Sequence, residues 1–204
     1  MQNLITGKIR LKGFNDKWEK VKLKTILEET KEKNKNLSFN NVLSISNKLG
    51  FLKQKEQFGR TVASKDLSKY KIIKNGYIGY NHSRINVGSI ATYNKIEEGI
   101  VSPMYIVLKT KEQLLNKFFM YFTDTNYFFK KMKNLLTGSV RDSLNFKDLC
   151  QMKINLPSLQ EQNAIVNILS KADEEIQLLQ KDLEQEKQKK KALMQLLLTG
   201  IIRV

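Results

Sequence analysis

The chain has 204 residues, and its 36 lysines and arginines outnumber its 20 aspartates and glutamates, giving a formal net charge of +16. In a chain long enough for one or two domains, this excess predicts an anionic partner, above all nucleic acid, and 41% apolar residues suffice for a folded core. One cysteine and one histidine exclude a disulfide scaffold and a metal centre rich in either residue, and no apolar stretch is long enough to span a membrane.

The first and last residues of the chain resemble each other. Residues 1–11 and 194–204 are identical at seven of eleven positions, at a constant offset of 193. We predict that residues 1–12 are the end of a preceding copy of the C-terminal helix, or a tail. The chain is then one period of a two-copy repeat, or a half that pairs with itself. Coincidence within a composition rich in leucine and lysine is the alternative.

Residues 13–157 are predicted to form the globular domain. Residues 18–27 are expected to be a strand or turn that runs into a short helix. Short β-prone runs follow, bounded by Gly, Asn and Ser, at 42–46, 71–73, 76–80, 89–93, 100–101 and 104–108. Residues 111–136 then change to helical spacing with an aromatic stripe, which could stack nucleobases but is more typical of a core. Cys150 is expected to be a small buried residue rather than a nucleophile.

Three polar segments of this domain contain the side chains best suited to reading DNA. Residues 81–89 and 137–145 each combine amide, hydroxyl and guanidinium groups, and residues 48–60 are expected to form a third loop with charge and glutamine. Arginine reads guanine and asparagine reads adenine in the major groove, while small residues let the backbone approach phosphate. The predicted DNA contacts are Arg84, Asn86, Ser139 and Arg141, followed by Asn81, Ser83, Lys53 and Arg60. Ordinary turn chemistry explains any single one of them equally well.

Residues 158–204 are predicted to be a long helix for dimerisation or spacing. Ser158 and Glu161 have the spacing of a capping box, Gly200 is a plausible stop, and the segment between them has no glycine or proline. Ten positions at alternating steps of four and three form a coiled-coil seam, which Glu186 and Lys190 interrupt within a charged run at 185–191. The other eight positions are apolar, at Ile165, Leu169, Ala172, Ile176, Leu179, Leu183, Leu193 and Leu197. Such a stripe needs a second helix, from this chain or another.

The net positive charge lies entirely before this helix. Residues 1–157 contain 29 basic and 13 acidic side chains, whereas residues 158–204 contain seven of each. A lysine-rich composition that serves only solubility is the alternative to nucleic-acid binding, and the size of the charge favours nucleic acid. The predicted fold class is α/β (α+β), with a mixed or antiparallel twisted sheet and packed helices before the long C-terminal coiled-coil helix.

The sequence contains none of the usual catalytic motifs. A Gly-rich dinucleotide fingerprint, a phosphate-binding loop, the HExxH motif and the Gly-x-Ser-x-Gly elbow are all missing. We therefore expect a cytoplasmic, non-enzymatic protein without a metal, a cofactor or a membrane partner. Two alternatives stay open, which are a coiled-coil adaptor with a basic RNA- or protein-binding domain and a metal-dependent nuclease.

Several motifs together are similar to a known family. They lie at residues 13–14 with 18–23, 83–89, 101–105 and 138–141, and the most specific is Leu-Pro-Ser-Leu-Gln-Glu-Gln at 156–162, which runs into the long helix. The chain resembles a specificity subunit of a type I restriction–modification system, reduced to one target-recognition domain and one conserved helical region. A full subunit of that family would carry two of each.

The resemblance implies a function without catalysis in this chain. The basic domain would read one half of a bipartite site on double-stranded DNA, and the helix would pair with a counterpart as a spacer. A half-subunit of this kind would form a homodimer through that helix. Methyltransferase (modification) subunits carrying S-adenosylmethionine would methylate adenine, and an ATP-dependent restriction subunit would translocate and cut.

Overall fold

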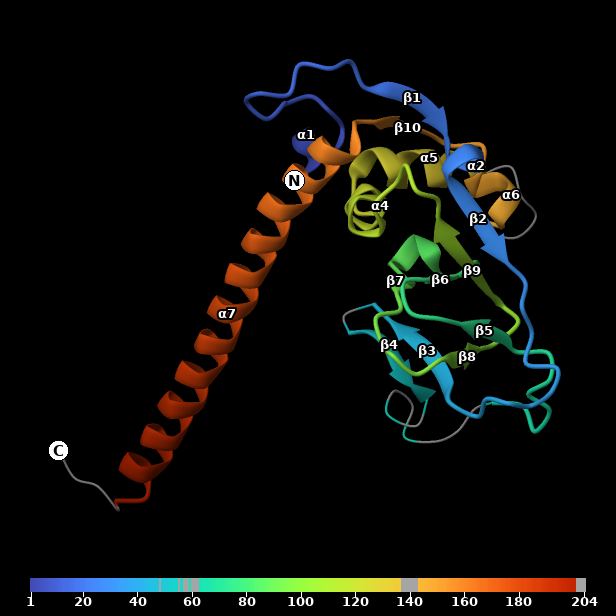
Figure 1. Ribbon diagram of the computed structural model, residues 1–204. Coiled ribbons are helices and arrows are strands. Elements are labelled where there is room, and N and C mark those ends of the chain that lie inside the picture. Colours follow the sequence, from blue (N-terminus) through green and yellow to red (C-terminus); the bar gives the residue numbers. More distant parts are fainter. Residues whose placement is uncertain (48, 55, 57–58, 60–62, 137–142, 201–204) are drawn as a thin grey trace. The chain divides into compact units, whose positions relative to one another are not determined.

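The computed structural model describes residues 1–47, 49–54, 56, 59, 63–136 and 143–200 (Figure 1). The chain divides into two compact units, Met1–Asn163 and Ala164–Val204. The architecture is mixed α+β with largely antiparallel sheets and a 40-residue C-terminal helix, which confirms the predicted fold class. None of the described helices combines the length and the apolar character that crossing a membrane requires.

The first unit contains short strands and helices in the order expected from the sequence. Its strands are β1 Glu19–Lys22, β2 Leu27–Thr30, β3 Val42–Ser46, β4 Gly50–Lys53, β5 Lys71–Ile73, β6 Ile78–Asn81, β7 Ile90–Thr92, β8 Gly99–Val101, β9 Tyr105–Thr110 and β10 Lys153–Leu156. Its helices are α1 Gln2–Ile5, α2 Leu23–Ile26, the 3₁₀ turn η1 Ile85–Val87, α4 Asn116–Thr123, α5 Asn126–Leu136 and α6 Phe146–Leu149. The last helix, α7, spans Leu159–Leu198 and begins in this unit.

Three sheets are formed by these described strands. Two have four strands, in the orders β2-β9-β6-β7 and β4-β3-β8-β5, and the third is the pair β1-β10. All pairings are antiparallel except β3 with β8. Part of the segment expected to be a loop at 48–60 is strand β4, so that expectation was wrong for residues 50–53. Gly50 turns the chain at φ 67°, and residues 50–53 then pair antiparallel with β3. Phe51 packs edge-on against Tyr93.

Two of the groups of buried side chains in the described residues are large enough to relate the sheets and helices to the core. Strands of both four-stranded sheets contribute to one of them, which contains Leu43, Ile45, Ile73, Ala91, Tyr93, Val101, Tyr105 and Val107. Aromatic side chains of α4 and α5 form the other, with Phe118, Phe119 and Phe122 buried and Phe128 in edge-to-face contact with Phe122 at 5.7 Å. Most of the aromatic stripe is therefore core, as its helical period indicated, whereas Tyr127 is 39% exposed.

The two similar ends of the sequence have the same local structure. Thr6 donates its hydroxyl to the Gln2 carbonyl at 2.7 Å, and Thr199 donates to Gln195 at the same distance. The glycine that follows each threonine, Gly7 or Gly200, has φ of 74° or 68°. The N-terminal segment thus ends as the long helix does, and its origin as the end of a preceding copy stays a prediction.

The start of α7 is held within the first unit by two buried polar side chains. Glu161, only 1% exposed, accepts from Arg10 Nε at 2.7 Å, Arg10 Nη2 at 2.8 Å and Trp18 Nε1 at 2.9 Å. Gln162, fully buried, accepts from Leu115 N and donates to the carbonyls of Gln113 and Pro157.

The predicted capping box at this helix start is only half correct. Ser158 Oγ accepts from Glu161 N at 3.4 Å, as expected for an N-cap. The Glu161 carboxylate, however, accepts from Arg10 and Trp18 instead of reaching back to the cap, because charge-assisted bonds to a guanidinium are the stronger ones.

Candidate nucleic-acid interface

The connection from β6 to β7 is one of the polar segments predicted to bind DNA, and all of its residues are described. Asn81 Oδ1 accepts from Ser83 N at 3.1 Å, and Asn81 N donates to Ser89 O at 3.0 Å. The Arg84 carbonyl accepts from Val87 N and Ser89 N, both at 3.2 Å. Gly88, at φ 85°, ends the 3₁₀ turn η1 in the left-handed region. The backbone is thus fixed by its own hydrogen bonds, and its side chains can project from a rigid support.

Two segments distant in the sequence lie against this connection. Leu144 N donates to the His82 carbonyl at 2.9 Å, which brings residues 143–145 beside it. Asn47, in the turn between β3 and β4, donates its amide to the Val87 carbonyl at 2.5 Å. We call Asn47 with residues 81–89 and 143–145 the loop cluster. Parts of all three predicted polar segments, or residues directly next to them, therefore meet at one place.

The loop cluster exposes donors and acceptors that the protein itself does not use. Ser83, Arg84 and Asn86 are exposed, and the side chains of Arg84 and Asn86 have no hydrogen-bond or ion-pair partner among the described residues. A guanidinium and a primary amide are the groups that read guanine and adenine edges in pairs of hydrogen bonds. The Ser83 hydroxyl forms a hydrogen bond with His82 Nδ1 at 3.2 Å, so fewer of its hydrogen-bonding positions are open to a DNA base.

The structure does not bring every predicted DNA contact to this cluster. Asn81 lies in the loop cluster, but its side-chain oxygen already accepts a hydrogen bond from the backbone of the same loop. Lys53 pairs with Leu43 at the end of β4 farthest from the turn, and it lines a different site. Ser139, Arg141 and Arg60 lie outside the described residues. For all eight residues, a contact with DNA stays a prediction.

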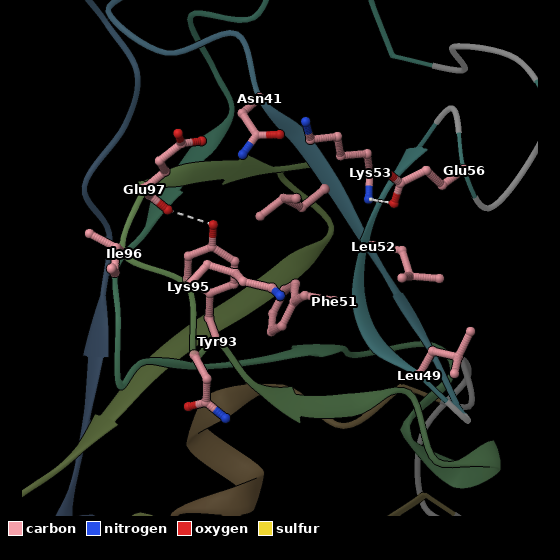
Figure 2. A pocket seen from close by; sticks show the side chains of 12 residues that line it. Asn41, Leu49, Phe51, Leu52, Lys53, Glu56, Tyr93, Lys95, Ile96 and Glu97 are labelled. Atoms are coloured by element: carbon pink, nitrogen blue, oxygen red, sulfur yellow. Dashed lines mark hydrogen bonds between the residues drawn. The ribbon is translucent and has the colours of Figure 1, made fainter. Parts of the chain in front are cut away.

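The site lined by Lys53 is an open pocket of about 620 Å³ between the β3–β4 hairpin and the segment after β7 (Figure 2). Leu43, Phe51 and Tyr93 contribute its apolar surface, and the Tyr93 hydroxyl donates to the Glu97 carbonyl at 2.5 Å. Its rim mixes both charges, with Lys53 and Lys95 beside Glu56 and Glu97. This balance gives the pocket no preference for an anion.

The described residues offer no obvious catalytic group. Cys150 is buried, as expected, and burial raises the pKa of its thiol above the ordinary value, which disfavours the reactive thiolate. Burial also raises the pKa of the Tyr80 hydroxyl. In the described ranges, no three His, Cys, Asp or Glu side chains are grouped in a way that could hold a metal ion.

The seam of α7 contains buried and exposed positions. Ile165 and Leu169 are 1% and 7% exposed. From position 172 onward every seam residue is exposed, and the large apolar ones are Ile176, Leu179, Leu183, Leu193 and Leu197, at 47–61%. An apolar stripe in water on both sides of the charged seam positions Glu186 and Lys190 is typical of a helix that pairs.

Some features of the site were missed from the sequence. Arg10 and Trp18 were not recognised as the partners of Glu161, and Asn47 was not singled out. Asn47 directly follows a predicted strand at 42–46, and a turn position of this kind is the only signal that could have identified it.

Comparison with known proteins gives consistent matches. The model of the type I restriction modification DNA specificity domain matches residues 15–188. The type I restriction enzyme MjaVIII specificity subunit of Methanocaldococcus jannaschii is 38% identical over 93 residues, which are 46% of this chain and 22% of that protein.

Solved structures share the fold. The HsdS subunit from Thermoanaerobacter tengcongensis has a TM-score of 0.61 at 18% identity, over 89% of this chain and 48% of that chain. A chain from a study of complex assembly and conformational transition of the type I R-M system has a TM-score of 0.58 at 18% identity, over 94% and 49%. This chain thus spans about half the length of the solved chains, and it matches less than a quarter of the curated relative.

Proposed function

This chain belongs to the type I restriction modification DNA specificity family, and from that premise we propose that it reads one half of a two-part site on duplex DNA. The observation that carries the proposal is the loop cluster, where Arg84 and Asn86 are exposed and unpaired on a hydrogen-bonded support. The charge of the body supports it as well, because an excess of 16 positive charges attracts a polyanion whatever its sequence.

The mechanism divides affinity and specificity between different groups. Lysines and arginines of the body neutralise phosphates and release counterions, which provides binding without sequence preference. Arg84 and Asn86 then form paired hydrogen bonds with base edges in the major groove, and only the right bases satisfy them. No proton or covalent bond is moved by this chain in such a scheme.

Helix α7 serves as the spacer in this proposal. Forty residues at 1.5 Å each give a helix of about 60 Å. Pairing of its exposed seam with the same seam of a second copy would set two recognition domains a fixed distance apart, and that distance would set the gap between half-sites. A homodimer of this kind would read two copies of the same half-site.

Catalysis is assigned to partner subunits. Modification subunits would bind S-adenosylmethionine and methylate a base in or beside each half-site, and a restriction subunit would use ATP. This chain would need no cofactor of its own, since its role is to recognise the target sequence and to bind the duplex.

Replacing Arg84 with alanine tests the reading role. The full chain is used to select duplexes from a randomised library at a fixed, stated salt concentration. If Arg84 pairs with guanine, R84A relaxes one base position and lowers affinity for the best duplex by about 1–3 kcal/mol, which is roughly 5- to 150-fold. The variant R84K keeps the positive charge but lacks the paired donors of the guanidinium. It should therefore relax the same base position with less loss of overall affinity. An equal loss for all sequences in R84A would mean a phosphate contact and would contradict base reading.

A further inference from the structure

The outer face of the two-stranded β1–β10 sheet is lined with lysines. In its register Lys22 lies directly opposite Lys153, and Lys20 lies opposite Asn155. All four side chains are exposed, whereas Ile154 and Leu156, at the alternate positions of β10, are buried. Because side chains alternate between faces along a strand, the three lysines and Asn155 share the outer face. Figure 1 shows β1 and β10 as neighbours beside α5.

This arrangement costs free energy in the isolated protein. Like charges directly opposite each other on paired strands repel and destabilise the sheet. Within the described part of the chain, Lys20, Lys22 and Lys153 form no ion pair. Lys31 and Lys109 differ from these three lysines, because Lys31 pairs with Glu29 and Lys109 pairs with Glu28. An anion bound from outside would relieve the repulsion between Lys22 and Lys153.

The lysine face is connected to the loop cluster by α5. The Tyr127 hydroxyl, at the start of α5, donates to the Lys153 carbonyl at 3.3 Å, and Lys131 Nζ lies 5.8 Å from the centre of the Tyr127 ring. Helix α5 then runs for 11 residues, about 16 Å at 1.5 Å per residue, and packs against η1, the turn that carries Asn86.

We propose that Lys20, Lys22 and Lys153 bind the phosphate backbone of the same duplex whose bases the loop cluster reads. The inference rests on the proposed function and adds to it a second contact region, with phosphate as its ligand. An acidic protein surface fits less well, because protein interfaces have an apolar or aromatic centre and this face offers only three lysines and an asparagine. The face would fix the position of the duplex and would contribute no base preference.

The test is the salt dependence of binding to a duplex of arbitrary sequence, measured on the full chain with the double variant Lys22→Ala/Lys153→Ala. Loss of one or two phosphate contacts should reduce the slope of log affinity against log salt by about 1–2, which at 0.15 M salt is on the order of 10-fold in affinity. The loss should be the same for every duplex sequence. The melting temperature should not fall, because removing a like-charge pair relieves repulsion.

The control is Lys31→Ala/Lys109→Ala, which removes the same charge from two lysines already paired with glutamates. Its slope should stay close to that of the unaltered chain. Equal slope changes in both variants would mean a general charge effect and would overturn the inference, as would a loss confined to one sequence. Unchanged duplex binding combined with lost binding of a modification subunit would assign the face to a protein partner instead. No duplex binding by the unaltered chain at any salt concentration would refute the proposed function itself, and this inference with it.

Discussion

Replacing Arg10 with alanine is expected to lower the free energy of unfolding by about 3–5 kcal/mol, because it leaves the buried Glu161 carboxylate without its countercharge. Arg10 provides two of the three hydrogen bonds that this carboxylate accepts, and the remaining one comes from the Trp18 indole. Glu161 is 1% exposed with Arg10 in place, so its carboxylate depends on the donors that the protein supplies. A neutral indole donor does not offset the charge.

The measurement is equilibrium unfolding in urea, followed by circular dichroism. Lys8→Ala is the matched control, since it removes the same charge from an exposed residue of the same segment and should change stability by no more than about 0.5 kcal/mol. Equal, small effects of the two substitutions would show that the Arg10–Glu161 pair is not needed. A large effect of R10A alone would show that the N-terminal segment and the start of α7 are held together by this pair.

Replacing Leu179 with glutamate is expected to raise the dissociation constant of the proposed homodimer by about 100-fold or more. Leu179 is a seam residue and is 61% exposed in the single chain. Burial of one leucine side chain contributes about 1.5–3 kcal/mol. In a two-fold symmetric dimer each substitution occurs twice, so the loss is about 3–6 kcal/mol, at 1.4 kcal/mol for each factor of ten.

Leu178→Glu provides a close control for this substitution. Leu178 is 62% exposed, as Leu179 is, but it lies outside the seam. Sedimentation equilibrium at micromolar concentration should show a dimer for the unaltered chain and for L178E, and a monomer for L179E. A monomeric unaltered chain in the absence of other subunits, or equal weakening by both substitutions, would contradict pairing through the seam.

The sequence predicted the positions of strands and helices better than the contacts between them. The strands at 42–46 and 71–73 agree with β3 and β5, because each is a compact β-prone run bounded by turn residues. The aromatic stripe of α4 and α5 was recognised as core from its period alone. Strand β4 was missed because Gly50, the lysines and the glutamines around it look like a loop, and only packing of Phe51 on Tyr93 identifies it as part of a sheet.

The candidate site was predictable where its chemistry is local. Arg84 and Asn86 were selected because their segment is rich in side chains that can form hydrogen bonds with DNA bases. Both are exposed in the structure. The pairing of Lys22 with Lys153 and of Arg10 with Glu161 could not be predicted, since these residues are more than 130 positions apart and local periodicity carries no information on register at that separation. The contact of Asn47 with Val87 depends on tertiary packing for the same reason.

The most direct measurement is a map of methylated bases in a cell that makes this chain and a modification subunit but no other specificity subunit. A self-paired chain that reads half-sites should direct methylation to an interrupted palindrome, and R84A should relax the same position in both halves. Methylation without a sequence motif, or no methylation at all, would contradict DNA reading by the loop cluster. An asymmetric two-part motif would contradict self-pairing, because two copies of one recognition domain cannot read two different half-sites.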